Sequence, residues 1–463
     1  MTYTICKEIS EHVFRAYDIR GIIGEELSED VIYTLGLALG SVIREKDQKK
    51  VVVARDGRLS GPLLMPALQA GLLKSGCNII DIGEVPTPFL YFANYHFNIP
   101  NGIMMTGSHN PRDYNGLKII IGGQVFCGDD IANIAKRIKD EKFIYGDGSI
   151  KKDSVVDAYF ERVLTDIHLS KKLKIVIDCG NGIAGKYAPK FFEKMGCEVI
   201  PLFCEVDGNF PNHHPDPTRL ENLIDLRNAI KKYQADIGLA FDGDGDRLGI
   251  LTDQGELIWP DRQLMLHAQD MLKRNPSAKI VFDVKCTRYL PKVIQEAGGD
   301  PIMWKTGHSF IKSKMIEVEA LLGGEMSGHF FFKERWYGFD DGLYAGARIL
   351  EILSKTEKSA HDIFAELPNS VNTPEIKLPL DDRYKFAFVN DLVSRSNFSN
   401  ATLSTVDGLR VDFEDGWGLI RASNTTPCVI FRFEANDELA LNRIQKLFRE
   451  QILKIDNTLE LPF

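Results

Sequence analysis

A hydroxyl and an imidazole stand side by side in the motif Thr106-Gly107-Ser108-His109-Asn110-Pro111. The motif follows the apolar run 102–105, which predicts a strand, so Ser108 is displayed where the strand ends and the backbone turns. Gly107 lets neighbouring backbone and a ligand come close. Such a serine suits the transfer of a group onto and off its hydroxyl. The alternative is a plain strand-to-loop turn with local hydrogen bonds.

A second motif, Asp242-Gly243-Asp244-Gly245-Asp246, sets carboxylates at every second position after the apolar run 237–241. Alternate side chains of an extended backbone share a side, so the three carboxylates point toward one place. Two carboxylates about 5 Å apart repel by roughly 3 kcal/mol at an effective dielectric near 20, and a bound cation removes that repulsion. Hard oxygen ligands fit Mg²⁺ completed by a phosphate oxygen. The alternative is a solvated acidic turn.

Two further polar loops follow predicted strands. Gly324-Glu325-Met326-Ser327-Gly328-His329 comes after the apolar run 320–323. Arg421-Ala422-Ser423-Asn424-Thr425 lies between the predicted strands 419–420 and 429–433. A guanidinium followed by short hydroxyl and amide side chains on one tight loop suits a phosphate group. A hairpin loop with local turns is the alternative for that last motif.

The elements that must position these loops repeat three times along the chain. Short β-branched runs at 50–54, 174–177 and 279–282 each predict a buried strand that opens a helix. About twenty residues later, Gly76, Gly196 and Gly298 predict helix ends that feed a second strand. A third strand then runs into one of the first three polar loops. Such alternation predicts α/β domains whose ligands gather at the carboxyl ends of strands, in one shared cleft if those ends face each other. The alternative is the general resemblance among α/β proteins.

The chain has 463 residues, too many for one core, so we expect several domains. The stretch 368–374, with a proline at each end, is typical of a linker, and the residues after it do not repeat the unit. The predicted boundaries are 1–153 (with the serine loop, 106–111), 154–256 (with the acidic loop, 242–246), 257–368 (with the loop 324–329) and 369–463 (with the loop 421–425).

Composition limits the partners. The net charge of −9 lacks the excess of basic residues that is typical of proteins that bind nucleic acid. The sequence has no run of about 18 apolar residues to span a membrane. The eight cysteines are scattered without a Cys-x-x-Cys pair, which argues against structural zinc and against a disulfide framework. These features favour a cytoplasmic protein without nucleic-acid or membrane partners; we expect a monomer or a weak dimer.

Together, the four loops closely resemble the signature loops of the α-D-phosphohexomutases, in the same order and over the whole chain, most of all the bacterial phosphomannomutase/phosphoglucomutase branch. The resemblance implies three related mixed-sheet α/β domains and a smaller α+β C-terminal domain, similar to the TATA-binding protein, around a central cleft. It also implies interconversion of mannose or glucose 1- and 6-phosphates through phospho-Ser108 and a hexose 1,6-bisphosphate. Glucose 1,6-bisphosphate or mannose 1,6-bisphosphate would be the activator.

The resemblance also implies roles for single residues. Mg²⁺ would be held by Asp242, Asp244, Asp246 and a phosphoryl oxygen on Ser108. The residues of the reaction centre would be Ser108, His109, Lys118, Arg20, Arg247 and His329, with His109, Lys118 and His329 as unranked candidates for proton transfer. The residues that bind the sugar and the second phosphate would be Tyr17, Lys285, Thr306, Gly307, His308, Glu325, Ser327, Arg421, Ser423, Asn424 and Thr425.

Three alternatives stay open at this stage. Phosphoglucosamine mutase would share the metal loop and much of the rest. A metal-dependent sugar-phosphate phosphatase would pass the phosphoryl group to water. A sugar-phosphate-binding protein without catalysis would have little reason to keep both Ser108 and the three aspartates.

Overall fold

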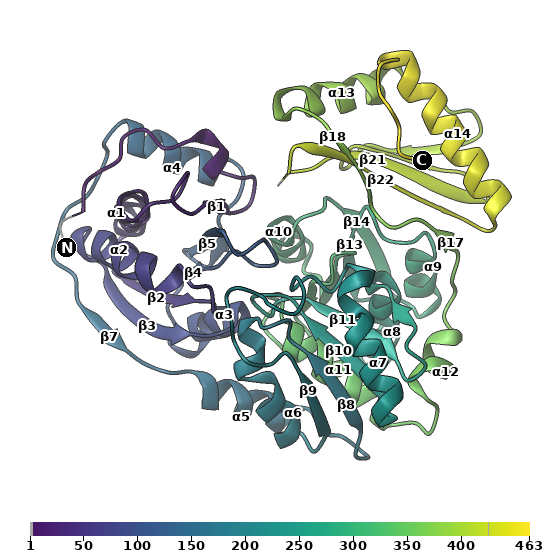
Figure 1. The fold of residues 1–463 in the computed structure, drawn as a ribbon, viewed down its shortest axis with the longest axis horizontal. Coiled ribbons are helices and arrows are strands. Elements are labelled where there is room, and N and C mark those ends of the chain that lie inside the picture. Colours follow the sequence, from purple (N-terminus) through teal and green to yellow (C-terminus); the bar gives the residue numbers. More distant parts are fainter. Residues whose placement is uncertain (1–2, 425) are drawn as a thin grey trace.

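The computed structural model describes residues 3–424 and 426–463 (Figure 1). They form four sheets, one after another along the chain. The first sheet has the order β1-β5-β4-β2-β3-β7, with the short β6 paired to β5. Its strands are β1 Ile19–Ile22, β2 Lys50–Arg55, β3 Asn78–Glu84, β4 Gly102–Met105, β5 Tyr114–Ile121, β6 Gln124–Val125 and β7 Ile150–Lys152. The helices of this part are η1 Glu11–Val13, α1 Glu29–Glu45, α2 Gly61–Lys74, α3 Thr87–His96 and α4 Asp129–Lys139.

The second sheet has the order β12-β11-β10-β8-β9. Its strands are β8 Lys174–Asp178, β9 Glu198–Leu202, β10 Ile237–Phe241, β11 Leu248–Thr252 and β12 Leu257–Ile258. The helices of this part are α5 Val156–Asp166, η2 Ile183–Lys186, α6 Ala188–Lys194, η3 Leu220–Leu223 and α7 Ile224–Tyr233.

The third sheet has the order β14-β13-β15-β16. Its strands are β13 Lys279–Asp283, β14 Asp300–Trp304, β15 Leu322–Gly324 and β16 Phe330–Phe332. The helices of this part are α8 Pro260–Leu272, α9 Tyr289–Glu296, α10 His308–Val318, α11 Gly342–Ser354 and α12 Ala360–Ala365.

The first three sheets share one topology, which confirms the predicted threefold repeat. In each sheet the first strand of the unit (β2, β8 or β13) lies parallel to both the second and the third strand. The third strand then pairs with an antiparallel return strand. The sheets are therefore mixed, and the polar loops come from equivalent turns between the third strand and its return strand.

The predicted helix ends are also confirmed. Gly76, Gly196 and Gly298 have φ values of +83°, +98° and +83°, and each follows a helix by two residues. Glycine adopts this left-handed conformation without the Cβ clash that other residues meet, so the chain can leave the helix and enter the next strand.

The fourth sheet is antiparallel, and the helices α13 Asp382–Arg395 and α14 Glu438–Ile455 lie on one face of it (Figure 1). Its strands are β17 Val371–Asn372, β18 Ile376–Pro379, β19 Thr402–Ser404, β20 Leu409–Asp412, β21 Gly416–Ala422 and β22 Cys428–Ala435. The predicted linker 368–374 is more than a connection, because β17 inside it pairs with β22. Two residues of strand are too short to leave an alternating pattern in the sequence.

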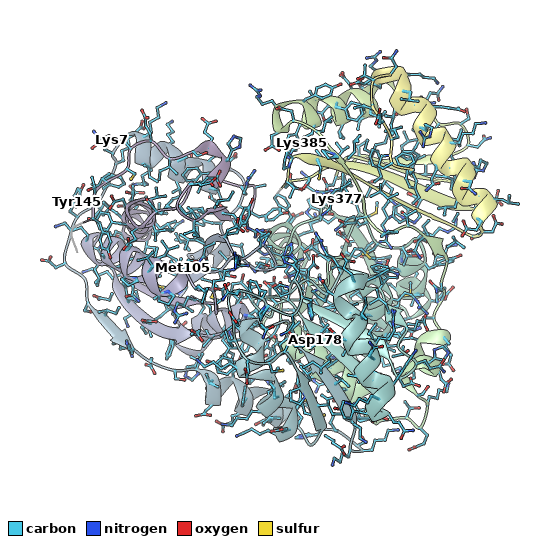
Figure 2. All side chains as sticks on the ribbon, viewed as in Figure 1. Lys7, Met105, Tyr145, Asp178, Lys377 and Lys385 are labelled. Carbon is cyan, nitrogen blue, oxygen red and sulfur yellow. The ribbon has the colours of Figure 1, made fainter. Side chains whose placement is uncertain are left out.

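One apolar core joins the first three units. It contains Val52 of β2, Ile177 of β8 and Phe282 of β13, whereas the fourth sheet has its own core around Phe388 and Phe448. Burial of shared apolar area is the dominant force that holds such units together. Figure 2 accordingly shows Met105 and Asp178, the last residues of β4 and β8, inside the outline, with Lys7 and Tyr145 at its edge. Within the described residues, the helices are all too short or too polar to cross a membrane.

Candidate active site

The serine loop lies directly against the acidic loop. Ser108 Oγ lies 3.1 Å from Asp242 Oδ2 and 3.2 Å from His109 Nδ1, and Ser108 is almost fully buried. Its backbone has a φ of +50°, a strained value for a residue with a Cβ. The Thr106 hydroxyl accepts a hydrogen bond from the Ser108 amide at 2.8 Å and helps to hold this turn. The two loops come from different sheets, so their meeting confirms the expected convergence of serine and carboxylates.

Arg58, which follows β2, holds the serine loop from behind. Its guanidinium donates hydrogen bonds to the carbonyls of Ser108 (2.8 Å), Asn110 (2.6 Å) and Pro111 in that loop and of Tyr114 at the start of β5. Asp56 accepts from the Thr106 hydroxyl at 2.7 Å. A Cβ at Gly107 would overlap the Arg58 guanidinium, so this glycine admits an arginine rather than a ligand. Asp56 and Arg58 directly follow the predicted strand 50–54, at the end of a strand where functional residues are expected, but they belong to none of the four motifs.

The acidic loop has the donor set of a divalent-cation site. The carboxylates of Asp242, Asp244 and Asp246 are fully buried, and one oxygen of each lies within 4.8 Å of the others. Thr87 Oγ1 donates to Asp244 Oδ2 at 2.5 Å, whereas the buried Asp244 Oδ1 has no hydrogen-bond partner among the described residues. Burial raises the pKa of Asp242 well above its usual range, and the neighbouring carboxylates of Asp244 and Asp246 raise it further. Oxygen ligands, crowded negative charge and an unpaired oxygen all fit Mg²⁺.

Lys118 brings a positive charge into the same space. Its ammonium lies 2.7 Å from Asp244 Oδ2 and also contacts Asp246 Oδ2. Burial disfavours the ammonium, but the two carboxylates outweigh burial and raise the pKa of Lys118 well above its usual range. In the same way, Lys118 lowers the pKa of Asp244 against the effect of burial. Lys118 is therefore a fixed positive charge beside the reacting group.

His109 stays neutral beside Ser108. Burial lowers the pKa of His109 well below its usual value, and the charges of Arg247 and Arg20 lower it further. Arg20 lies on β1, where its guanidinium forms an ion pair with Asp18. A neutral imidazole with a ring nitrogen 3.2 Å from the Ser108 hydroxyl has a lone pair to offer to a proton.

The acidic loop is joined to the third unit through Arg247. Arg247 and His329 pair as an isolated β-bridge, and the Leu248 amide donates to the Gly328 carbonyl at 3.0 Å. Arg247 Nε donates to His329 Nε2 at 3.0 Å and lies 3.7 Å from Asp242. The predicted catalytic residues Arg247 and His329 therefore share one contact network with Ser108.

The loop 324–329, which the family resemblance assigns to the sugar, is held by residues 306 and 307, just before α10. Glu325 Oε1 accepts from the Gly307 amide at 2.6 Å, and burial raises the pKa of Glu325. The Thr306 hydroxyl donates to Asp283 at 2.9 Å, and Gly307 has a φ of +135° that only glycine adopts without strain. The segments 306–308 and 324–329, which carry predicted sugar-binding residues, are therefore neighbours. Ser327, in the second segment, is partly exposed.

The expected phosphate loop is held by acidic partners. Arg421 is buried and donates from Nε to Asp407 at 2.9 Å, and Asp407 also accepts from the Thr306 amide at 3.0 Å. Lys285 lies 2.6 Å from Glu375. One Asp407 carboxylate thus ties the fourth unit to the third, a link that no local pattern predicted.

The remaining predicted phosphate contacts lie on the turn after Arg421. The hydroxyl oxygens of Ser423 and Thr426 lie 2.9 Å apart, and Asn424 is half-buried in that turn. Thr425 lies outside the described residues.

Tyr17 links the first unit to this region. Its ring meets the His308 ring edge-on at 5.6 Å, and it packs against Gly307. Burial raises the pKa of Tyr17, and the charge of Arg421 opposes that rise. Tyr17, His308 and Arg421 were predicted as substrate contacts, and the structure brings them together from three units.

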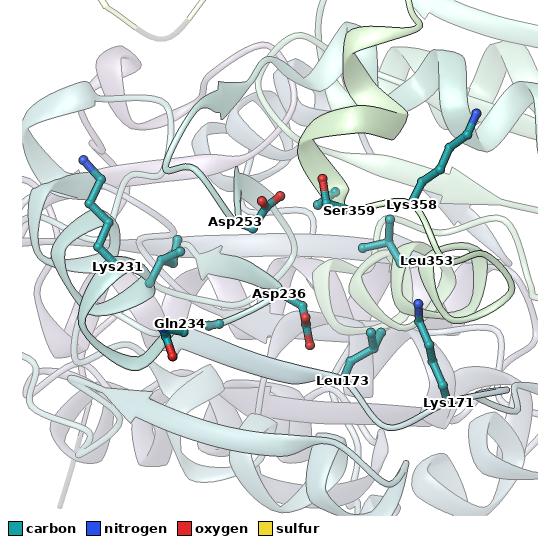
Figure 3. Close-up of a pocket in the computed structure, with 12 residues that line it drawn as sticks. Lys171, Leu173, Lys231, Gln234, Asp236, Asp253, Leu353, Lys358 and Ser359 are labelled. Carbon is teal, nitrogen blue, oxygen red and sulfur yellow. The ribbon is translucent and has the colours of Figure 1, made fainter.

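The cavity in Figure 3, about 410 Å³ in volume, is a different place. Asp236 and Leu173 in its wall immediately precede β10 and β8. These are the amino ends of strands whose carboxyl ends carry the acidic loop and its neighbours. Ligands of α/β sheets gather at the carboxyl ends, so this cavity is not our candidate active site.

The chain matches four models of the phosphoglucomutase/phosphomannomutase family. Alpha/beta/alpha domains I, II and III match residues 11–145, 157–255 and 259–371, and the C-terminal domain matches residues 375–451. Each model matches most of one of the four sheets.

Similar proteins extend over the full chain. A phosphomannomutase/phosphoglucomutase of Pseudomonas putida is 52% identical over 463 residues, which is 100% of both chains. A phosphoglucomutase of Neisseria gonorrhoeae is 50% identical over 96% of this chain and 97% of the relative. A crystal structure of a phosphoglucomutase/phosphomannomutase family protein from Burkholderia thailandensis is 50% identical, has a TM-score of 0.94 and covers 98% of this chain and 100% of that one. With the first three of its polar loops in contact and its whole length matched, this chain belongs to the phosphoglucomutase/phosphomannomutase family of α-D-phosphohexomutases.

Proposed function

We propose that this protein interconverts the 1- and 6-phosphates of mannose and glucose as a phosphohexomutase. The observation that carries the proposal is the contact of Ser108 Oγ with Asp242 at 3.1 Å, inside a cluster of three buried carboxylates. A serine beside a cation site is the arrangement that phosphoryl transfer needs, because catalysis there consists of positioning and of charge stabilisation.

The reaction has two transfers. The bond between phosphorus and Ser108 Oγ breaks while phosphorus bonds to the free hydroxyl of the sugar phosphate, and that hydroxyl loses its proton. The hexose 1,6-bisphosphate then turns around, and its other phosphoryl group returns to Ser108. Asp242, Asp244, Asp246 and a phosphoryl oxygen on Ser108 would hold Mg²⁺, which when bound neutralises charge on the transferring group. Glucose 1,6-bisphosphate or mannose 1,6-bisphosphate would load the free serine.

The chain's own cations surround the transferring group. Lys118 and Arg247 contact the acidic loop directly. Arg20 is close enough for its positive charge to lower the pKa of His109. Of the three candidates for proton transfer, we assign His109 to the proton of the Ser108 hydroxyl, which Ser108 loses when the second phosphoryl group returns to it. It is neutral and lies beside Ser108, whereas Lys118 stays charged and His329 Nε2 already accepts from Arg247.

The third and fourth units would bind the rest of the substrate. Glu325 and Ser327 would form hydrogen bonds with the sugar hydroxyls, and the segment 306–308 would orient the sugar ring. The grip on the second phosphate would comprise Tyr17, Lys285, Arg421, Ser423, Asn424 and Thr425. Because either phosphate of the bisphosphate must enter this grip, the pocket has to accept both orientations of the sugar.

The names of the similar proteins favour mannose and glucose phosphates. Relatives near 50% identity carry the names phosphomannomutase/phosphoglucomutase or phosphoglucomutase, whereas an N-acetylphosphoglucosamine mutase of Aspergillus fumigatus is 13% identical with a TM-score of 0.61 and shares the fold alone. Kinetics with mannose 1-phosphate, glucose 1-phosphate and glucosamine 6-phosphate side by side would test this preference.

The decisive experiment is intact-protein mass before and after incubation with glucose 1,6-bisphosphate. We expect the protein to gain one phosphoryl group, and Ser108→Ala to gain none and to lose mutase activity. Full activity of Ser108→Ala contradicts the mechanism. Release of inorganic phosphate without isomerisation would instead assign a phosphatase.

Three further expectations belong to the proposal. The domain boundaries are 1–153, 154–256, 257–368 and 369–463, and a central cleft lies between the four units. The eight free cysteines support a cytoplasmic protein. A monomer or a weak dimer, without nucleic-acid or membrane partners, is the expected assembly, and sedimentation velocity would check it.

A further inference from the structure

Asp340 is a buried carboxylate at the back of His329, and no motif of the sequence marked it. It is fully buried, and its Oδ2 lies 3.0 Å from His329 Nδ1 and 3.8 Å from His308 Nδ1. Its other oxygen, Oδ1, lies 2.8 Å from Lys312 Nζ. A buried charge needs a partner to remain charged, and Lys312 supplies it. Lys312 lowers the pKa of Asp340 against the effect of burial, so the carboxylate stays ionised.

The hydrogen bond on the far side of the imidazole fixes where the ring proton sits. Arg247 Nε lies 3.0 Å from His329 Nε2, and a guanidinium can only donate. His329 Nε2 must therefore be the acceptor, and the ring carries its proton on Nδ1. That nitrogen lies 3.0 Å from Asp340 Oδ2 and 3.5 Å from Asp246 Oδ1. Both carboxylates favour a proton on Nδ1, and Asp340 is the nearer of the two.

The tautomer in turn decides what Arg247 can do. With Nε bound to His329, the Arg247 side chain is anchored beside Asp242, at 3.7 Å. Its two terminal nitrogens are then left to meet a phosphoryl group as a fork. If His329 carried its proton on Nε2 instead, two donors would face each other at 3.0 Å and Arg247 would have to move.

We propose that Asp340 is a positioning residue that holds the Nδ1–H tautomer of His329 and through it orients Arg247 toward the transferring phosphoryl group. The proposal rests on the proposed phosphohexomutase function for its effect on catalysis, but not for the tautomer itself. The path runs from Lys312 through Asp340, His329 and Arg247 to Asp242, and it joins α10 of the third unit to the acidic loop of the second.

The first test is Asp340→Asn, which keeps the size of the side chain but removes the charge. Its amide can also present N–H groups to His329. We expect kcat with glucose 1-phosphate to fall at least tenfold, because Arg247 acts on the transferring group, and KM to change less than threefold, because Asp340 lies behind His329 rather than in the phosphate grip. A kcat within twofold of the unmodified protein overturns the proposal.

Asp341→Asn is the matched control. Asp341 is the adjacent, equally buried carboxylate, but it accepts from the Tyr159 hydroxyl at 2.8 Å and from the Tyr344 amide at 3.0 Å. We expect this variant to have a lower Tm and an unchanged kcat. If Asp341→Asn lowers kcat as much as Asp340→Asn does, loss of buried charge rather than positioning explains both, and the proposal fails.

The second test reads the tautomer directly and needs no activity. The protein with ¹⁵N-labelled histidine, its His329 signals assigned with His329→Gln, should give the Nδ1–H pattern in a two-bond ¹H–¹⁵N spectrum. Asp340→Asn should lose that pattern. A proton on Nε2 in the unmodified protein overturns the proposal. Absence of mutase activity together with the Nδ1–H pattern would instead reject the proposed function and leave the role of Asp340 for the His329 tautomer intact.

Discussion

At the scale of single residues, burial and neighbouring charge decide what each side chain can do. His109 lies beside Ser108 and Lys118 lies beside Asp244 and Asp246, and both are buried. Burial and the charges of Arg247 and Arg20 lower the pKa of His109, so it is neutral, whereas two carboxylates face Lys118 and keep it charged. Both residues were candidates for proton transfer from the sequence. Their surroundings make His109 a base and Lys118 a fixed positive charge.

Arg58 gives the first prediction at this scale. Arg58→Lys keeps a positive charge but cannot offer the guanidinium fork to four carbonyls in and just after the serine loop. Ser108 would then lose the support for its positive φ. We expect kcat to fall by about ten- to a hundredfold, a cost of roughly 1.4–2.7 kcal/mol in the barrier, while circular dichroism stays unchanged. Steady-state kinetics check this, and an unchanged kcat would mean that the loop holds its own shape.

His267 gives a prediction about stability and pH. It lies in α8, edge-on to Phe330 and Phe332, and neither ring nitrogen has a hydrogen-bond partner among the residues that the structure describes. Burial, with a contribution from Arg348, lowers its pKa from 6.5 to about 3. The unfolded chain binds a proton near pH 6.5 and the folded chain does not, so stability present above pH 6.5 is lost as pH falls. By pH 5 the loss is about 2 kcal/mol.

The measurement is the Tm of the protein and of His267→Met at pH 7.5 and pH 5. Methionine fills a similar volume and has no titrating group. We expect the variant to lose less Tm between the two pH values than the unmodified protein does. Equal losses would show that His267 does not contribute to the acid sensitivity.

At the scale of elements, glycines at helix ends set where each strand of the repeat begins. Gly298 ends α9 with a φ of +83°, and nothing lies within 4 Å of the place where a Cβ would be. Its role is therefore purely conformational. The same position recurs as Gly76 and Gly196 in the other two units, so the three repeats turn from helix to strand by one device.

We expect Gly298→Ala to lower stability by about 1 kcal/mol, since a Cβ is unfavourable in the left-handed region. Gly298→Asn should lose less, because asparagine tolerates this conformation better. Thermal unfolding of both variants, with kinetics as the control, checks the prediction. Activity should not change, because Gly298 lies between a helix and the entry of β14, away from the polar loops.

At the scale of the whole molecule, many polar contacts and a small apolar cluster of Val284, Trp417 and Leu419 tie the fourth unit to the third. Its core is separate from the core that joins the first three units. Arg410 donates to the Val284 and Cys286 carbonyls, on either side of Lys285, and Asp407 links Arg421 to Thr306. These contacts fix the predicted phosphate grip relative to the sugar-binding segments.

Asp407→Ala should therefore weaken binding more than chemistry. It removes the acceptor of Arg421 Nε and of the Thr306 amide at once. We expect KM for glucose 1-phosphate to rise about tenfold, which is about 1.4 kcal/mol, with kcat within threefold. Asp415→Ala is the control, because its ion pair with Arg443 on the same unit is exposed and contributes little. A larger effect on kcat than on KM would contradict this view of Asp407.

The sequence by itself determined the threefold repeat and the glycine helix ends, and it predicted the chemistry of the four loops. Each of these depends on neighbouring residues, such as alternating aspartates or a glycine after a helical pattern. The predicted linker 368–374 lies where the third and fourth family models meet, but its two-residue strand β17 left no pattern. The expectation that Gly107 lets a ligand come close was wrong, because Arg58 fills that space.

The tertiary structure alone decided which distant residues meet. Thr87 and Lys118 contact Asp244 across 157 and 126 residues of chain, and Arg58, Asp340 and Asp407 act through partners on other elements. Charge states belong here as well, because the pKa of a group depends on burial and on charges that are near in space rather than in sequence. Local patterns cannot encode those contacts, since they exist only after the shared apolar core has brought the first three sheets together.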